Sequence, residues 1–223
     1  MSLDISREDQ VMQSFNEIIH RMNGVDCLIN NAGVQPPIGQ FHNTVLKDWK
    51  KNFDINLFGT VNCTFAVINK MIMQKKGKII NMSGGGSTSS RPNFSAYAAA
   101  KTAVVRFTET IAEELREYNI DVNAVSPGAI NTNMLDEVIA ADINAGNELF
   151  EAINRKENGG NDPGLAADLI CFLCSDLSGG ITGKLISAPW DKWNEKEFQE
   201  LLRTNKDLAV LRRIDNKTFF KKS

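Results

Sequence analysis

The segment KIINMSGGG, residues 78–86, opens the stretch of sequence that decides the fold. Its continuous apolar run predicts a buried strand that ends where Ser83 and three glycines begin. Beyond a polar loop, a helical pattern over residues 95–117 carries Tyr97 and Lys101. Residues four apart lie on one face of a helix, so we expect the phenol and the ammonium to reach one pocket. A cation this close is expected to lower the tyrosine pKa from about 10, which makes Tyr97 a candidate proton donor or acceptor for a carbonyl/alcohol pair.

Three other motifs lie in a fixed order around this stretch. One apolar strand pattern ends at NNAG (residues 30–33), another ends at SPGAINT (residues 126–132), and a long helical pattern contains Asn56. Together with the Tyr and Lys of residues 97–101, these motifs resemble the short-chain dehydrogenase/reductase family. They match its NNAG, its helix asparagine, its YxxxK and its PG-x-x-x-T. The resemblance extends from Asp4 to Ser187.

The resemblance implies an α/β fold, a Rossmann-like doubly wound parallel sheet whose N-terminal strands are missing. Residues 1–187 are expected to form a partial NAD(P)-binding domain, with a helical substrate lid near residues 133–161. Residues 188–223 are expected to be a C-terminal extension of the same domain. The family's glycine-rich loop, TGxxxGIG, does not occur in the sequence, so the chain resembles a family member without its N-terminal third.

The implied function is NAD(P)-dependent interconversion of an alcohol and a carbonyl. By resemblance, Tyr97 is the general acid/base, Lys101 lowers its pKa and holds the nicotinamide ribose, and Asn56 anchors a proton-relay water. A mid-helix asparagine bonded to backbone is the structural alternative for Asn56. The family's catalytic serine would fall at Gly84; Ser83 is one residue early and serves only if the glycines re-aim it, and Ser87 is a remoter candidate.

The resemblance also implies a set of cofactor contacts. The cofactor is NAD or NADP, and the residue that separates them is not found. The Asp-apolar pair is assigned to the adenine, the NNAG residues to the ribose, and the residues after the third strand to the nicotinamide carboxamide and pyrophosphate. The residues concerned, besides Tyr97 and Lys101, are Asp4, Ile5, Asn31, Ala32, Gly33, Pro127, Gly128, Ile130 and Thr132.

Two other functions remain open at this point. One is a non-catalytic, truncated protein that folds only as an oligomer; the other is an epimerase or dehydratase that uses the same Tyr-Lys pair.

The missing N-terminal strands also affect assembly. The strand at residues 25–31 lacks its usual neighbour in the sheet and becomes an apolar edge. We therefore expect a homodimer or homotetramer through the helices of residues 44–75 and 95–117, with that edge covered by another copy or by N-terminal residues.

Composition restricts the class of protein further. The chain has 223 residues, 42% hydrophobic and 23% charged, with a net charge of −2, which argues against nucleic-acid or membrane partners. No apolar run reaches the ~18 residues of a membrane span, and the N-terminus has no signal core, which favours a cytoplasmic protein. Arg212-Arg213 and Lys221-Lys222 make the end of the chain basic, and a docked surface helix is the expected role of this tail rather than nucleic-acid binding.

The four cysteines and the helix ends allow narrower predictions. Cys171-x-x-Cys174 lies in an apolar helical run with no second pair nearby, so both are predicted to be small buried core residues and no metal site is proposed. Ser6 is the expected N-cap of the first helix, and Asp162-Pro163 is expected to start a helix after the lid.

Overall fold

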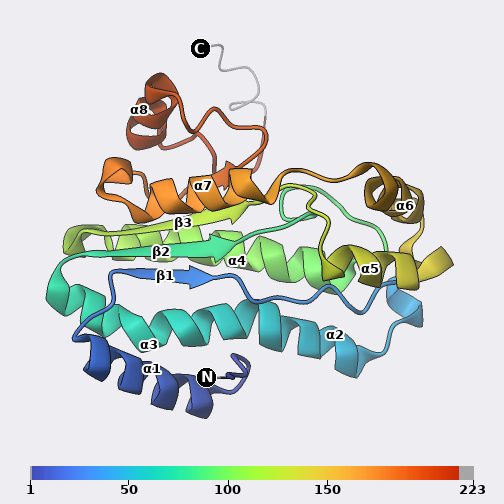
Figure 1. The fold of residues 1–223 in the computed structure, drawn as a ribbon, viewed down its shortest axis with the longest axis horizontal. Coiled ribbons are helices and arrows are strands. Elements are labelled where there is room, and N and C mark those ends of the chain that lie inside the picture. The colour runs from blue at the N-terminus through green and yellow to red at the C-terminus, as the bar shows by residue number, and fades with distance from the viewer. Residues whose placement is uncertain (1, 216–223) are drawn as a thin grey trace.

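The structure is a computed structural model that describes residues 2–215. Within them four parallel strands form one sheet in the order β1-β2-β3-β4. The strands are β1 (Cys27–Asn30), β2 (Gly77–Met82), β3 (Ile120–Ser126) and β4 (Leu185–Ser187). The labelled arrows of β1, β2 and β3 point the same way in Figure 1, and β4 is parallel to β3, so the carboxyl ends of the strands meet at one edge. The predicted α/β Rossmann-like architecture is confirmed.

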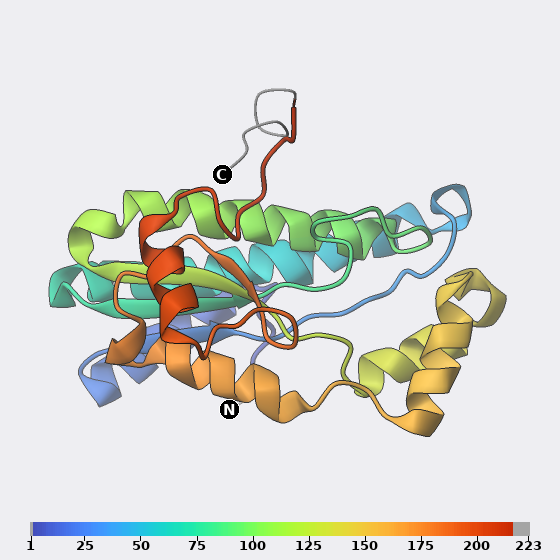
Figure 2. The same cartoon turned by 90° about the horizontal axis from the view of Figure 1, so that it is seen from above.

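Helices cover both faces of this sheet (Figures 1 and 2). One face carries α3 (Gly59–Gln74) and α4 (Ser95–Glu114), and α1 (Glu8–Met22) packs against α3. The opposite face carries α7 (Pro163–Cys174). Successive side chains of a strand point to opposite faces, so Ile79 of β2 enters the core beneath α3 and α4 while Ile80 enters the core beneath α7.

The helical pattern expected over residues 44–74 is not one uninterrupted helix. Helix α2 (Leu46–Phe53) passes through a π-helical turn, Asp54–Phe58, into α3. A π turn inserts one extra residue and frequently occurs at functional sites. Asn56 lies in this turn and is fully buried.

The predicted lid consists of α5 (Asn133–Ala140) and α6 (Glu148–Asn158), which lie beyond the carboxyl ends of the strands in Figure 2. The C-terminal extension adds α8 (Lys196–Thr204), whose Leu202 is buried in the core beneath α7. The extension also binds the last strand, because the N–H of Leu185 donates to the carbonyl of Ala209 at 2.8 Å. Lys221-Lys222 lie outside the described residues.

Strand β1 is an edge strand, as predicted, and pairs with β2 alone among the described residues. Ile29 on this strand is 46% exposed. The N-terminal residues do not cover it, because Leu3 and Ile5 pack instead against the core beneath α3. That part of the prediction is wrong for residues 2–215, since the short segment before α1 follows the α3 side of the sheet.

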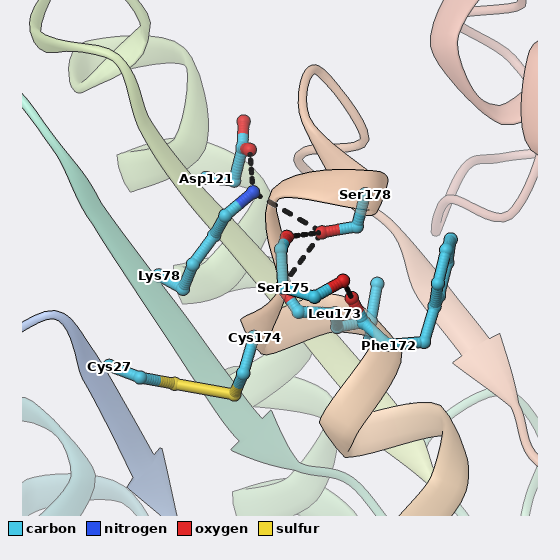
Figure 3. Close-up of a disulfide and its surroundings, with 8 residues drawn as sticks. All are labelled: Cys27, Lys78, Asp121, Phe172, Leu173, Cys174, Ser175 and Ser178. Atoms are coloured by element: carbon cyan, nitrogen blue, oxygen red, sulfur yellow. Dashed lines mark hydrogen bonds and ion pairs between the residues drawn. A yellow bond between two sulfur atoms is a disulfide. The ribbon is translucent and has the colours of Figure 1, made fainter.

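Figure 3 shows that Cys27 of β1 and Cys174 of α7 form a disulfide, with their α-carbons 6.1 Å apart. Cys171 is exposed, and Cys63 is buried. The prediction that Cys171 and Cys174 are both buried core residues is therefore wrong. The inward face of α7 is occupied by Leu169 and Leu173, and the helical rotation of 3.6 residues per turn places residue 171 outward.

The helix ends give one error and one confirmation. Ser6 is not the N-cap of α1, because its N–H and hydroxyl both donate to the Asp4 carboxylate at 3.0 and 2.7 Å. Arg7 occupies the cap position without a side-chain bond. Asp162 does cap α7, since its carboxylate accepts the N–H of Gly164 at 2.8 Å with Pro163 as the first helical residue.

Figure 3 also shows a buried ion pair between Lys78 of β2 and Asp121 of β3, with N and O 2.7 Å apart.

Candidate active site

The largest concentration of predicted site residues surrounds a cavity of about 930 Å³ at the carboxyl ends of the strands. In open α/β sheets, ligands bind in this place. The loop after each of β1, β2 and β3 contributes to the wall, together with α4, helices α5 and α6 of the predicted lid, and the start of α7. The predicted residues that line the cavity are Asn31, Ala32, Gly33, Ser83, Tyr97, Lys101, Pro127, Gly128, Ile130 and Thr132.

Tyr97 and Lys101 lie one turn apart on α4, and both are buried. The Lys101 Nζ donates to the carbonyl oxygen of Met82 at 3.0 Å and lies 5.7 Å from the centre of the Tyr97 ring. Burial disfavours the charged ammonium and lowers the pKa of Lys101 to about 8. Lys101 is thus held by the end of β2 with its ammonium directed at the cavity wall.

The pKa of Tyr97 moves in the opposite direction to the one predicted. Burial of the phenol raises the pKa, because the phenolate loses its hydration, and the positive charge of Arg91 opposes that rise. Lys101 makes no comparable contribution: its Nζ lies over the ring and is bonded to Met82. The expectation that Lys101 lowers the tyrosine pKa is wrong for the protein without a bound cofactor.

Asn56 joins the π turn to the loop after β1. Its Nδ2 donates to the carbonyl of Val34 at 2.8 Å, and its Oδ1 accepts the N–H of Val34 at 3.2 Å. Gly33 packs so closely here that a β-carbon at this position would lie 2.7 Å from Asn56 Oδ1 and 3.3 Å from Lys101 Nζ. The Asn56 side chain therefore has the backbone-bonding role, and it places Gly33 beside Lys101.

Gly84, rather than Ser83, faces the tyrosine hydroxyl. A β-carbon on Gly84 would fall 2.2 Å from the phenol oxygen of Tyr97. The hydroxyl of Ser83 instead donates to the hydroxyl oxygen of Ser87 at 2.9 Å, and both residues are buried. The single-residue offset seen in the sequence thus persists in space, and the glycines do not turn Ser83 toward Tyr97.

Sequence analysis missed two charged residues of this site. Arg91 lies with its guanidinium carbon 3.9 Å from the centre of the Phe94 ring and 5.5 Å from that of Tyr97. Its Nε and Nη2 donate to the two carboxylate oxygens of Glu148 at 2.6 and 2.5 Å. No local pattern in the sequence predicts this pair, because Glu148 lies 57 residues after Arg91, on α6.

The PG-x-x-x-T loop is held by residues that its motif does not include. Gly128 has a φ of 83°, and a β-carbon there would lie 2.8 Å from both Asn161 Oδ1 and Pro189 Cγ. The next N–H, that of Ala129, donates to Asn161 Oδ1 at 2.8 Å. Trp190 lines the cavity beside this loop. Glycine is required at position 128 because the backbone is left-handed and the space is filled.

Asp4 and Ile5 are not among the residues that line the cavity. The Asp4 carboxylate is bonded to Ser6, which holds its pKa below the usual value. Ile5 packs on Gly59 at the start of α3, and its carbonyl accepts from Asn62 Nδ2 at 3.0 Å. The structure therefore separates this pair from the other predicted cofactor contacts.

Comparison with known proteins agrees with this geometry. Residues 1–188 match the family described as Enoyl-(Acyl carrier protein) reductase. The chain is 33% identical over 186 residues to 3-oxoacyl-(acyl-carrier-protein) reductase FabG of Aquifex aeolicus, a match that covers 83% of this chain and 73% of the relative. It is 32% identical over 163 residues to human Dehydrogenase/reductase SDR family member 4, covering 73% and 58%.

The fold of the chain is also similar to that of solved structures over most of its length. The NAD+-bound xylitol dehydrogenase superposes with a TM-score of 0.77 at 26% identity, over 84% of this chain and 76% of that one. A gluconate 5-dehydrogenase from Burkholderia cenocepacia, in complex with NADP and tartrate, gives 0.72 at 28% identity over 83% and 71%. The chain belongs to the short-chain dehydrogenase/reductase family. It is an NAD(P)-dependent oxidoreductase with a Rossmann-like fold.

No helix among the described residues is long and apolar enough to cross a membrane.

Proposed function

We propose that the protein interconverts an alcohol and a carbonyl, with Tyr97 as the general acid/base and Lys101 beside it. The observation that carries this proposal is the shared cavity: the buried phenol and the buried ammonium face the loops after β1, β2 and β3. Tyrosine with a cation nearby is suited to deliver a proton to a carbonyl oxygen or remove one from an alcohol. The substrate is a small alcohol or carbonyl compound.

The residues present fit the nicotinamide and ribose end of NAD or NADP. Gly33 supports this fit, because a side chain there would fill the space beside Lys101. Ala32 and Gly33 would approach the ribose with Lys101 as a donor, while Ile130 and Thr132 would contact the carboxamide and pyrophosphate. The cofactor supplies or accepts the hydride when bound. Asp4 and Ile5 would contact the adenine. Asn31, Pro127 and Gly128 would frame the cofactor from the loops after β1 and β3.

The protein's own residues then perform the proton chemistry. The hydroxyl of Tyr97 donates its proton to the substrate oxygen in reduction and takes it back in oxidation. Asn56 fixes the loop after β1 next to Lys101, where a water between them would relay protons. The lid excludes bulk water, because Leu135 and Val138 of α5 pack in one apolar cluster with Phe94 and Tyr97. Ser83 remains a candidate donor only if its bond to Ser87 is exchanged for one to the substrate.

The test measures reduction of a panel of small ketones at millimolar NADH or NADPH. High concentrations are chosen because the sequence contains no TGxxxGIG segment, and we expect weak dinucleotide binding. Tyr97→Phe should lose turnover at least tenfold and keep the cofactor affinity of the parent, since only the proton donor is removed. Lys101→Ala should reduce both. More than a tenth of the activity remaining in Tyr97→Phe would exclude the assignment, and no turnover by the parent at saturating cofactor would favour a non-catalytic role.

We also propose that the protein is a homo-oligomer through α3 and α4. Apolar side chains on the outer face of α3 support this: Phe65 is 62% and Met73 80% exposed. Exposed apolar residues of this kind are typical of subunit interfaces. Sedimentation at micromolar concentration should give a dimer or tetramer, and Phe65→Glu should shift it toward monomer. A parent protein that sediments as a monomer with a cooperative melt would exclude the proposal.

A further inference from the structure

Gly85 and Gly86, the two glycines that follow the position of the family's serine, pack against Arg91. A β-carbon on Gly85 would lie 3.6 Å from Cζ, Nε and Nη1 of Arg91, so the guanidinium rests against bare backbone. Gly86 has a φ of 88°, and a β-carbon there would lie 3.0 Å from Arg91 Cβ and 2.6 Å from Ala98 Cβ. The loop therefore folds tightly onto the first turn of α4 with Arg91 enclosed.

The other side of the guanidinium faces aromatic rings and the lid. Arg91 stacks on Phe94 and reaches Tyr97, while both carboxylate oxygens of Glu148 accept from it. The side chains of Arg91 and Glu148 are only 14% and 31% exposed. A bidentate, poorly hydrated pair fixes the geometry of both partners more strongly than a surface pair does. Glu148 is the first residue of α6, so the pair joins the lid to the loop beside Tyr97.

We propose that Arg91 is a positioning residue for Tyr97, and that Glu148 sets how strongly its positive charge acts on the phenol. The proposal rests on the acid/base role proposed for Tyr97. A cation near the phenol favours phenolate, and a carboxylate on that cation cancels part of its field. Forming or opening the pair between the loop and the lid would then change how readily Tyr97 gives up its proton.

Other charged groups surround Tyr97 and must be separated from this effect. The Lys101 Nζ lies 5.7 Å from the centre of the Tyr97 ring and bonds to the carbonyl of Met82. Glu151 and Arg155 of α6 line the same cavity without stacking on Tyr97. Arg91 is the one for which burial, stacking and a lid contact coincide. The raised pKa of Tyr97, with Arg91 as the opposing charge, agrees with this arrangement.

The experiment reads the ionisation of Tyr97 directly. The chain has two tyrosines, so Tyr118→Phe leaves Tyr97 as the sole one. Ring-labelled tyrosine then gives a single carbon resonance, followed against pH while circular dichroism reports folding. Arg91→Met should lower the acid dissociation constant of the Tyr97 phenol about tenfold or more, and Arg91→Lys should restore part of that loss. Glu148→Gln should raise the same constant, because it removes the negative charge that opposes Arg91. Arg155→Met, a cavity arginine that does not stack on Tyr97, is the matched control and should change it little.

Several results would overturn the proposal. One is an unchanged titration in Arg91→Met, and another is an equal shift in Arg91→Met and Arg155→Met. The third is a Glu148→Gln shift in the same direction as the Arg91→Met shift, because a purely structural role of the pair would give that result. If Arg91→Met does not fold, the nearly isosteric Glu148→Gln decides alone. The titration needs neither cofactor nor turnover. A catalytically inactive protein therefore leaves it interpretable, and a failed titration leaves the proposed reaction standing.

Discussion

Replacing Gly84 with alanine measures how tightly Tyr97 is fitted against the glycine run. A β-carbon at position 84 would lie 2.2 Å from the phenol oxygen, 2.9 Å from Cζ and 3.1 Å from Cε1 of Tyr97. Gly85 provides the matched control, because its β-carbon meets Arg91 atoms at 3.6 Å, an ordinary contact. Of the three glycines, only Gly86 has a positive φ, so neither substitution strains the backbone.

The magnitude follows from burial. Tyr97 is 5% exposed and packs in a cluster with Phe94 and Leu135, so its ring has little room to move. Forcing a methyl group into a packed site costs about 1–3 kcal/mol of unfolding free energy. Replacing glycine with alanine at a compatible site adds about 0.4–1 kcal/mol by restricting the unfolded chain. The restriction of the unfolded chain applies to both variants and cancels between them, so Gly84→Ala should be less stable than Gly85→Ala by at least about 1 kcal/mol, or about 2–4 °C in Tm for a chain of this size.

The assay is thermal unfolding of the parent and both variants at one protein concentration, with urea unfolding to confirm the order. The expected order of stability is Gly85→Ala, then the parent, then Gly84→Ala. Equal stability of the two variants would refute the reasoning, because it would mean that Tyr97 moves into the cavity at no cost. The Tyr97 resonance in the Tyr118→Phe background shows whether the ring has moved.

Two further predictions concern buried titratable groups. Burial lowers the pKa of Lys101 from 10.5 to about 8, so the unfolded chain binds more protons between these values and stability should rise as pH increases through that window. Lys101→Met should remove a cost of about 3 kcal/mol below pH 8 and flatten this part of the urea-stability profile; an unchanged profile would contradict it. The exposed Cys171 should react quickly with a thiol reagent, whereas Cys63, whose pKa burial raises to about 11, should react only on unfolding; equal rates would contradict this prediction.

The parts of the fold that could be predicted from the sequence depend on local patterns. Short apolar-rich stretches mark β1, β2 and β3, and β2 is buried on both faces, as is typical of an inner strand of a parallel sheet. The cavity could be predicted from the motifs that follow these strands, since the carboxyl ends of parallel strands meet at one edge. Tyr97 and Lys101 meet there because both lie on one helix with a fixed spacing.

The parts that could not be predicted depend on contacts between distant segments. Arg91 and Glu148 are 57 residues apart, and Cys27 and Cys174 are 147 apart, so no local period brings either pair together. The sign of the Tyr97 pKa change was wrong for a related reason. Spacing along the helix places Lys101 near Tyr97 but does not show how deeply the phenol is buried. The loss of hydration raises the pKa of Tyr97 by more than the positive charge of Arg91 lowers it.

Gly84 and Arg91 are better understood as one linked arrangement than as a lost serine with an unrelated arginine nearby. Without a side chain at position 84, the phenol oxygen of Tyr97 occupies the space that a β-carbon would take. A phenol buried so deeply is harder to ionise, because its phenolate loses hydration. The neutral hydroxyl of a serine would stabilise that phenolate less than the full positive charge of an arginine does. The same glycine run makes room for that charge, because Arg91 rests on Gly85. Since Glu148 holds the guanidinium from the lid, proton transfer at Tyr97 and closure of the lid are expected to depend on each other.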